Sequence, residues 1–69
     1  MTAHLKSPDG TVEQVECAVV SVWEQSGVIA LMQPQPKEVG ELYVYQCFSA
    51  NAWIRMRSID ADNTEIELV

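Results

Sequence analysis

Few side chains in this sequence could take part in catalysis or metal binding. The two cysteines, Cys17 and Cys47, stand thirty positions apart, and His4 is the single histidine. This spacing gives neither a Cys-x-x-Cys pair nor a zinc quartet. A thiol nucleophile also needs a base within hydrogen-bond reach, and no local motif places His4 beside either cysteine. We therefore expect buried, reduced thiols, with a disulfide as the alternative if the chain works in an oxidising compartment. We predict no catalytic residue, no metal and no cofactor.

Other motifs of known chemistry are incomplete. No serine lies in a Gly-x-Ser-x-Gly elbow, and no glycine pattern of a phosphate-binding loop is present. Asp60, Asp62 and Thr64 alternate as the first ligands of a calcium loop do, but Glu65 stands at the sixth position, where such a loop has glycine. A polar turn is the better interpretation. The sequence thus predicts a protein that is not an enzyme.

The chain is acidic, with ten Asp and Glu against four Lys and Arg and a net charge of −6. This balance disfavours nucleic-acid backbones and anionic membranes as general partners. With 69 residues, 48% of them hydrophobic, the sequence predicts one small globular domain over residues 1–69. No apolar stretch approaches the ~20 residues of a membrane span, and no signal-sequence pattern is present, so we expect a cytoplasmic protein without membrane contact.

A β-hairpin is expected at the start of the chain. Pro8 and Asp9 suit the central positions of a type I turn, and Gly10 suits the left-handed residue that follows in a short hairpin loop. The next segment, residues 11–32, allows two interpretations. Its many valines favour a long, bent strand through Trp23, a turn at residues 24–27 and a return strand at residues 28–32.

A helix over about residues 12–26 is the alternative for this segment, because several apolar positions also share one helical face.

The second half of the chain is clearer, with three antiparallel strands expected at residues 42–48, 53–59 and 63–69. Residues 33–41, rich in proline, are expected to form a loop that divides the domain into two halves.

The expected fold is therefore all-β, a small antiparallel meander of five or six strands that closes toward an SH3-like barrel. The alternative is an α+β domain, with the one helix packed on a four- or five-stranded antiparallel sheet.

Alternation of side chains along the expected hairpin of residues 42–59 defines a candidate binding surface. One face holds Tyr43, Tyr45, Cys47, Ile54, Met56 and Ser58 and is the expected core face. The opposite face is expected to be exposed, because an unpaired guanidinium is costly to bury; the alternative is that the first half of the chain closes the barrel over this face, so that its aromatic residues belong to the core. It holds Val44, Gln46, Phe48, Trp53, Arg55 and Arg57.

The last hairpin offers an alternative explanation for the arginines. A three-residue loop at residues 60–62 pairs apolar with apolar residues and opposite charges with each other: Ile54–Leu68, Met56–Ile66, Arg55–Glu67 and Arg57–Glu65. In this register the arginines are ordinary cross-strand partners of glutamates. The strand at residues 63–69 is expected to be an exposed edge, protected by its glutamates.

Aromatic side chains beside arginines have the composition of an interface hot spot. We therefore expect a non-catalytic protein–protein interaction module that binds another protein, or a second copy of itself, through the exposed face of the 42–59 hairpin. Adaptors, small inhibitors and assembly subunits, including those of phages and other mobile elements, are often of this size. The alternative is a small barrel that binds single-stranded nucleic acid through Phe48, Trp53, Arg55 and Arg57.

Overall fold

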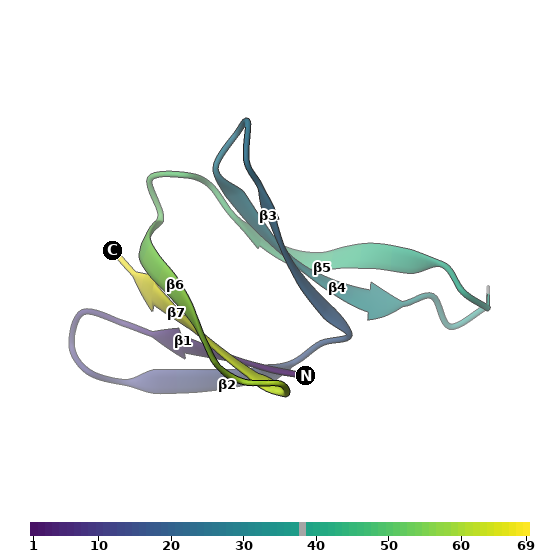
Figure 1. Ribbon diagram of the computed structural model, residues 1–69, viewed down its shortest axis with the longest axis horizontal. Helices are drawn as coiled ribbons and strands as arrows, with labels where there is room; N and C mark the ends of the chain where they lie inside the picture. Colours follow the sequence, from purple (N-terminus) through teal and green to yellow (C-terminus); the bar gives the residue numbers. More distant parts are fainter. Residues whose placement is uncertain (38) are drawn as a thin grey trace.

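The computed structural model describes residues 1–37 and 39–69, and it is all-β, as the sequence predicts. The strands are β1 (Thr2–Lys6), β2 (Val12–Glu16), β3 (Val19–Trp23), β4 (Val28–Pro34), β5 (Leu42–Phe48), β6 (Trp53–Asp60) and β7 (Asn63–Leu68). They form a four-stranded sheet in the order β2-β1-β7-β6 and a three-stranded sheet in the order β3-β4-β5 (Figure 1).

The order of strands departs from a simple meander. β1 pairs in parallel with β7, which places β7 in the interior of the four-stranded sheet and not at its edge. The prediction of an exposed terminal strand is therefore wrong. The chain changes sheet between β2 and β3 and again between β5 and β6, and no ladder joins the two sheets within the described residues. The expected barrel is consequently not closed.

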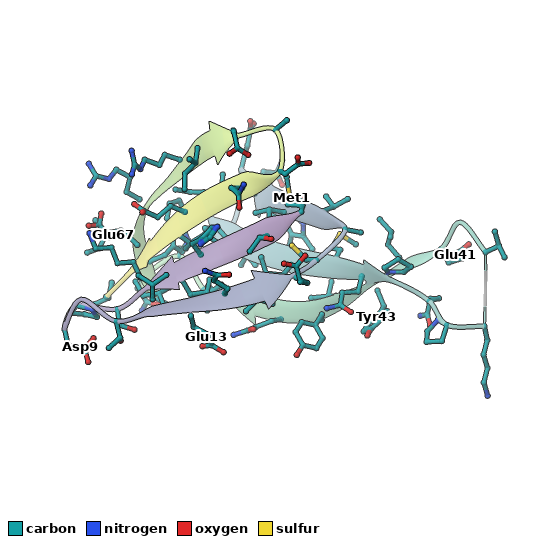
Figure 2. The ribbon with its side chains drawn as sticks, turned by 90° about the horizontal axis from the view of Figure 1, so that it is seen from below. Met1, Asp9, Glu13, Glu41, Tyr43 and Glu67 are labelled. Atoms are coloured by element: carbon teal, nitrogen blue, oxygen red, sulfur yellow. The ribbon has the colours of Figure 1, made fainter. Side chains whose placement is uncertain are left out.

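The β1–β2 hairpin confirms the first predicted turn. The Gly10 amide donates to the Ser7 carbonyl at 3.0 Å, and Gly10 has a φ of 91°, in the left-handed region that glycine tolerates. Asp9 fixes the turn because its carboxylate accepts hydrogen bonds from the amide and the hydroxyl of Thr11. Asp9 and Glu41 mark opposite ends of the molecule in Figure 2.

Residues 12–26 form strands, so the helical alternative is wrong. The expected bent strand is two strands, β2 and β3, that belong to different sheets. The change occurs between two consecutive residues: the Cys17 amide donates to the Met1 carbonyl at 2.9 Å, and the Ala18 amide donates to the Met32 carbonyl at 2.8 Å. The predicted turn at residues 24–27 and the return strand are confirmed as the β3–β4 hairpin.

The predicted 42–59 hairpin is wrong. β5 pairs with β4, and β6 pairs with β7, so the two strands of the expected hairpin lie in different sheets. Residues 33–41 do not separate two halves of the domain either. They include the β4–β5 hairpin loop, which is closed by a bond from the Gln35 amide to the Glu41 carbonyl at 2.9 Å. Glu38, within this predicted loop, lies outside the described residues.

The β6–β7 register largely confirms the prediction, with Arg55 opposite Glu67, Met56 opposite Ile66 and Arg57 opposite Glu65. The ends of the ladder differ. Ile54 is the extra residue of a β-bulge, so Trp53, and not Ile54, pairs with Leu68. A second bulge at Ile59 shortens the final loop to Ala61 and Asp62, because Asp60 pairs with Asn63. Each bulge shifts the alternation of side chains by one position.

The core lies between the inner faces of the two sheets. The fully or nearly buried side chains of this cluster are Ala3, Leu5, Cys17, Ile29, Leu31 and Ile66. Partly buried side chains pack around them: Val15, Val20, Val22, Phe48, Trp53, Met56 and Leu68. β4 lies in the middle of its sheet, with Ile29 and Leu31 buried on its inner side; the small side chain of Ala30, between them on the outer side, is fully buried as well.

Candidate functional site

The structure does not bring the six predicted binding residues onto one exposed face. Phe48 and Trp53 are partly buried and pack against the core. Gln46 pairs with the buried Leu31 and so lies on the inner side of its sheet. Arg55 and Arg57 lie on the outer side of the other sheet, opposite glutamates. Val44 is the one member of the set on the outer side of the three-stranded sheet.

Trp53 is held inside the molecule by packing and by a hydrogen bond. Its indole Nε1 donates to the Gly27 carbonyl at 2.8 Å, which joins β6 to the β3–β4 turn. The bulge at Ile54 is the reason for this direction, since it moves Trp53 to the same side of β6 as Met56. Ile54, expected in the core, is 64% exposed instead. Trp53 therefore contributes to packing between the sheets.

The arginines form the predicted ion pairs. Arg55 Nη2 lies 3.0 Å from Glu67 Oε2, and Arg57 Nε lies 3.2 Å from Glu65 Oε1. The hydrogen bond from Arg57 lowers the pKa of Glu65, and the positive charges of Arg57, Lys6 and Arg55 lower it further. These cations are thus already balanced by carboxylates on a solvated surface, as the alternative explanation of the sequence predicts.

The outer side of the three-stranded sheet is the most apolar exposed surface on the strands. Residues that pair directly point to the same side of a sheet, so the register identifies its members. We call this surface the apolar face: Val19, Ser21, Trp23, Val28, Ala30, Met32, Pro34, Leu42, Val44 and Cys47. None of the residues of β3, β4 and β5 is charged.

Large side chains on the apolar face remain open to solvent. Trp23 is 47% exposed, Val44 42%, Leu42 40% and Val19 37%. Tyr45, the extra residue of a bulge opposite Leu31 and Met32, is exposed beside them along β5. The exposed tryptophan of this protein is therefore Trp23 and not the predicted Trp53.

Polar residues occupy the outer side of the four-stranded sheet. The register places the following side chains there: Val12, Gln14, Glu16, Thr2, His4, Lys6, Asn63, Glu65, Glu67, Arg55, Arg57 and Asp60. Val12 is the single apolar member. The two outer faces of the molecule therefore differ sharply in composition, one charged and the other uncharged.

The residues considered for catalysis lie apart. His4 points to the outer side of the four-stranded sheet, where its Nε2 lies 2.8 Å from Asn63 Oδ1. Cys17 is buried, as predicted, but Cys47 is exposed on the apolar face, so that half of the prediction is wrong. Neither thiol–imidazole dyad considered for the sequence is assembled.

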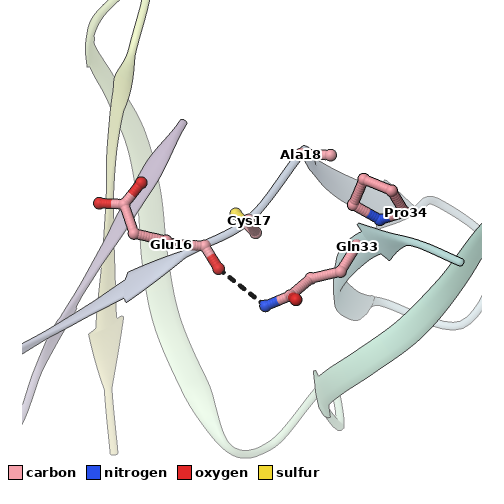
Figure 3. Close-up of a pocket in the computed structure, with 5 residues that line it drawn as sticks. All are labelled: Glu16, Cys17, Ala18, Gln33 and Pro34. Atoms are coloured by element: carbon pink, nitrogen blue, oxygen red, sulfur yellow. Dashed lines mark hydrogen bonds between the residues drawn. The ribbon is translucent and has the colours of Figure 1, made fainter. Parts of the chain in front are cut away.

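Cys17 lines a shallow hollow at the corner between β2 and β3 (Figure 3). The amide of Gln33 crosses this corner and donates to the Glu16 carbonyl at 2.9 Å. Burial raises the pKa of the Cys17 thiol; the positive N-terminus opposes this shift, and the negative charge of Glu16 adds to it. A thiol with a raised pKa remains protonated near neutral pH and is a weak nucleophile.

The carboxylate of Asp60 forms hydrogen bonds within the β6–β7 turn. Asp60 accepts hydrogen bonds from the Asn63 side chain and from the Asp62 amide, which lower the pKa of Asp60. The described residues contain no group of three or more His, Cys, Asp or Glu side chains that could hold a metal ion. Nor do they include a helix of the length and hydropathy needed to cross a membrane.

Comparisons of the chain with models of known protein families, with curated proteins and with solved structures gave no match.

A signal in the sequence could have identified the apolar face. Half-buried strands of an antiparallel sheet usually alternate between apolar and polar residues. β3 and β4 lack this alternation and contain no charge, which indicates that both of their sides are apolar. The valines of β3 correctly indicated a strand. Because they occur at both even and odd positions, they did not reveal which side of the strand faces the core.

Proposed function

We propose that this protein is a non-catalytic protein–protein interaction module that binds through the apolar face of its three-stranded sheet. The observation that supports this proposal is the separation of charge between the two sheets. β3, β4 and β5 contain no charged residue, whereas the outer side of the four-stranded sheet contains charges of both signs. An exposed apolar surface on a small acidic protein favours association with another apolar surface.

Trp23 is the expected anchor of this surface. Tryptophan is enriched among the residues that supply most of the binding energy at protein interfaces. Trp23 stands at one end of the face, opposite Val28, and about half of it is accessible. Neighbouring apolar side chains can exclude water around it once a partner is bound.

Single-stranded nucleic acid has less support as a ligand. Such a site needs aromatic side chains beside unpaired cations. Here Phe48 and Trp53 pack against the core, and Arg55 and Arg57 pair with glutamates on the opposite side of β6 from Trp53. The cytoplasmic location remains a prediction from the sequence.

A substitution in the apolar face tests the proposal. The wild-type protein and the variant Trp23→Ser are immobilised and exposed to extract from the native host, and captured proteins, including the chain itself, are quantified by mass spectrometry. We expect Trp23→Ser to lose the association that the wild type shows, because its anchor is removed. Circular dichroism verifies that both proteins are folded.

Val12→Ser provides the matched control. Val12 is 52% exposed, like Trp23, but lies on the charged outer side of the other sheet. We expect this variant to retain the association. Equal capture by the wild type and both variants would contradict the proposal.

A further inference from the structure

The occupant of the apolar face can be identified from its charge and shape. We propose that a second copy of this chain packs on it, face to face, to form a two-fold symmetric dimer. This inference rests on the proposed function, since it names the partner of the same face.

The distribution of charge permits two acidic chains to associate. Each copy has a net charge of −6, so two copies repel each other at long range. The strands of the contact surface contribute none of this charge, because the charged residues lie on the four-stranded sheet and in the connections between strands. Contact through the apolar face therefore buries no charged residue of these strands without a partner.

The side chains of the apolar face lie in four rows across the strands. The register gives these rows in order: Trp23 and Val28; Ser21, Ala30 and Cys47; Val19, Met32 and Val44; Pro34 and Leu42. The second row consists of small side chains and the third of large ones. The face is thus low in the second row and raised in the third.

This arrangement is self-complementary. Consider a two-fold axis that lies between the two copies, runs across the strands and passes between the second and third rows. Rotation about this axis places the second row of each copy on the third row of the other. Small side chains then meet large ones. The same axis leaves each strand opposite its own counterpart, so Val28 of one copy lies over Pro34 of the other, with Trp23 on one side of this contact and Leu42 on the other; the reverse contact follows by symmetry.

The size of the face suits a dimer of moderate affinity. A fully exposed aromatic side chain offers roughly 150–250 Å² and an aliphatic one less, and Trp23 is 47% exposed, so the face and the neighbouring Tyr45 together have on the order of 500–700 Å² accessible per copy. Two copies would bury about 1,000–1,400 Å² in total, near the lower end of the range for specific interfaces. We therefore expect a dissociation constant on the order of micromolar.

Sedimentation velocity over a wide range of protein concentration measures this dimer. We expect the wild type and Val12→Ser to change from monomer to dimer near micromolar concentration. Trp23→Ser and Met32→Ser should bind at least about tenfold more weakly, because each removes a side chain from the contact. Met32 provides a second position should Trp23→Ser alter the fold.

Ionic strength distinguishes a second copy from a basic partner. Added salt screens the repulsion between two acidic chains, so their association becomes stronger. It also screens the attraction between an acidic chain and a basic protein, so that association becomes weaker. We expect the dissociation constant of the wild type to decrease when the salt concentration is raised from low to physiological.

Cys47 reports the geometry. In the proposed dimer the two Cys47 residues are displaced by about 7 Å along the strands and about 10 Å across the interface, or about 12 Å between Cα atoms. Cys17 is 7% exposed, so a short bismaleimide reaches Cys47 first. We expect a covalent dimer from the wild type, and none from Cys47→Ser or from Trp23→Ser.

A wild-type chain that stays monomeric at several hundred micromolar would overturn the dimer. So would a dimer that Trp23→Ser and Met32→Ser leave unchanged, since it would form through another surface. A monomeric chain that captures a different host protein in a Trp23-dependent manner overturns the dimer but leaves the proposed function intact. If the wild type and Trp23→Ser capture the same proteins in the same amounts from host extract, the proposed function itself is contradicted.

Discussion

The two tryptophans of this protein have different surroundings. Trp53 packs against the core and donates a hydrogen bond to Gly27, whereas Trp23 lies about half exposed on an uncharged surface. The same residue type is therefore part of the interior at one position and of an exposed apolar surface at the other. Substitutions at the two positions should separate these roles.

Trp53→Ala should lower the free energy of unfolding by about 3 kcal/mol, because it leaves a space between the two sheets. Trp53→Phe should cost about 1 kcal/mol, since it retains most of the packing but leaves the Gly27 carbonyl without its indole donor. Trp23→Ser should change the free energy of unfolding by less than about 1 kcal/mol. Urea denaturation of dilute, monomeric protein measures all three.

The reverse order, with Trp23→Ser more destabilising than Trp53→Ala, would show that the indole of Trp23 is the one that packs in the core.

Acid pH should weaken the fold through its turn carboxylates. Hydrogen bonds from Thr11 lower the pKa of Asp9, and hydrogen bonds from Asn63 and the Asp62 amide lower the pKa of Asp60. The unfolded chain then takes up protons first as the pH falls. The stabilising effect is complete above about pH 4, the ordinary pKa of aspartate, and is lost as the pH falls through the lower folded-state pKa.

The midpoint of urea denaturation between pH 6 and pH 2 measures this effect. Asp60→Asn should show a smaller decline over the acid range than the wild type, because the amide does not titrate. Identical declines for the two proteins would show that Asp60 titrates alike in the folded and unfolded chains.

Prediction from the sequence worked best where neighbouring residues decide the outcome. The pairing of Arg55 with Glu67 and of Arg57 with Glu65 follows from opposite charges at matching positions of one hairpin. The direction of Trp53 did not follow, because the bulge at Ile54 leaves no mark in the sequence: isoleucine is an ordinary strand residue. One undetected extra residue reversed the side assigned to Trp53.

At the scale of the strands, turns were predictable and partners were not. Residues 8–10 and 24–27 contain glycines that are suited to left-handed backbone, and both are hairpin turns. The segment between β5 and β6 also resembled a hairpin loop, and the Ala52 amide does bond the Ser49 carbonyl there. The chain then enters the other sheet, a choice that depends on which distant strands bury the most apolar surface.

The β3–β4 turn and the β5–β6 connection touch each other. Gly27 has a φ of 72°, and a Cβ atom at this position would lie 2.8 Å from the Cβ atom of Ala50. Gly27→Ala should therefore lower the free energy of unfolding by about 2 kcal/mol, from left-handed strain together with this close contact.

Ala50→Gly separates the two causes in a double-mutant cycle. Adding it to Gly27→Ala removes the contact but not the strain, so the double variant should be more stable than the sum of the two single changes implies. If the changes in the free energy of unfolding, measured by urea denaturation, are strictly additive, the side chains at positions 27 and 50 do not clash.

At the scale of the whole molecule, the outer faces of the two sheets differ in charge. The all-β class followed from short apolar segments and turn residues, and these are local properties. The contrast between the two outer faces did not follow, because it depends on how the chain distributes seven strands between two sheets. A sequence with evenly spread acidic residues thus folds into a molecule with one uncharged side.

Association of the whole molecule should also stabilise its fold. Because a dimer of folded chains draws the unfolding equilibrium toward the folded state, a concentration tenfold above the dissociation constant adds about 1.4 kcal/mol. For a domain of this size such an increment raises Tm by several degrees. Thermal unfolding at increasing concentrations should show this rise for the wild type and not for Trp23→Ser. A constant Tm for both would argue against the dimer.

The bulge at Ile54 has a consequence for sequence change in this protein. Deleting that one residue would place Trp53 directly before Arg55 in the chain. Regular alternation in β6 would then keep the indole on the inner side while the arginines kept their glutamate partners. Substituting Ile54 alters only an exposed side chain. A shortened chain and a chain substituted at the same position should therefore both keep their interior, so the strand tolerates either change there.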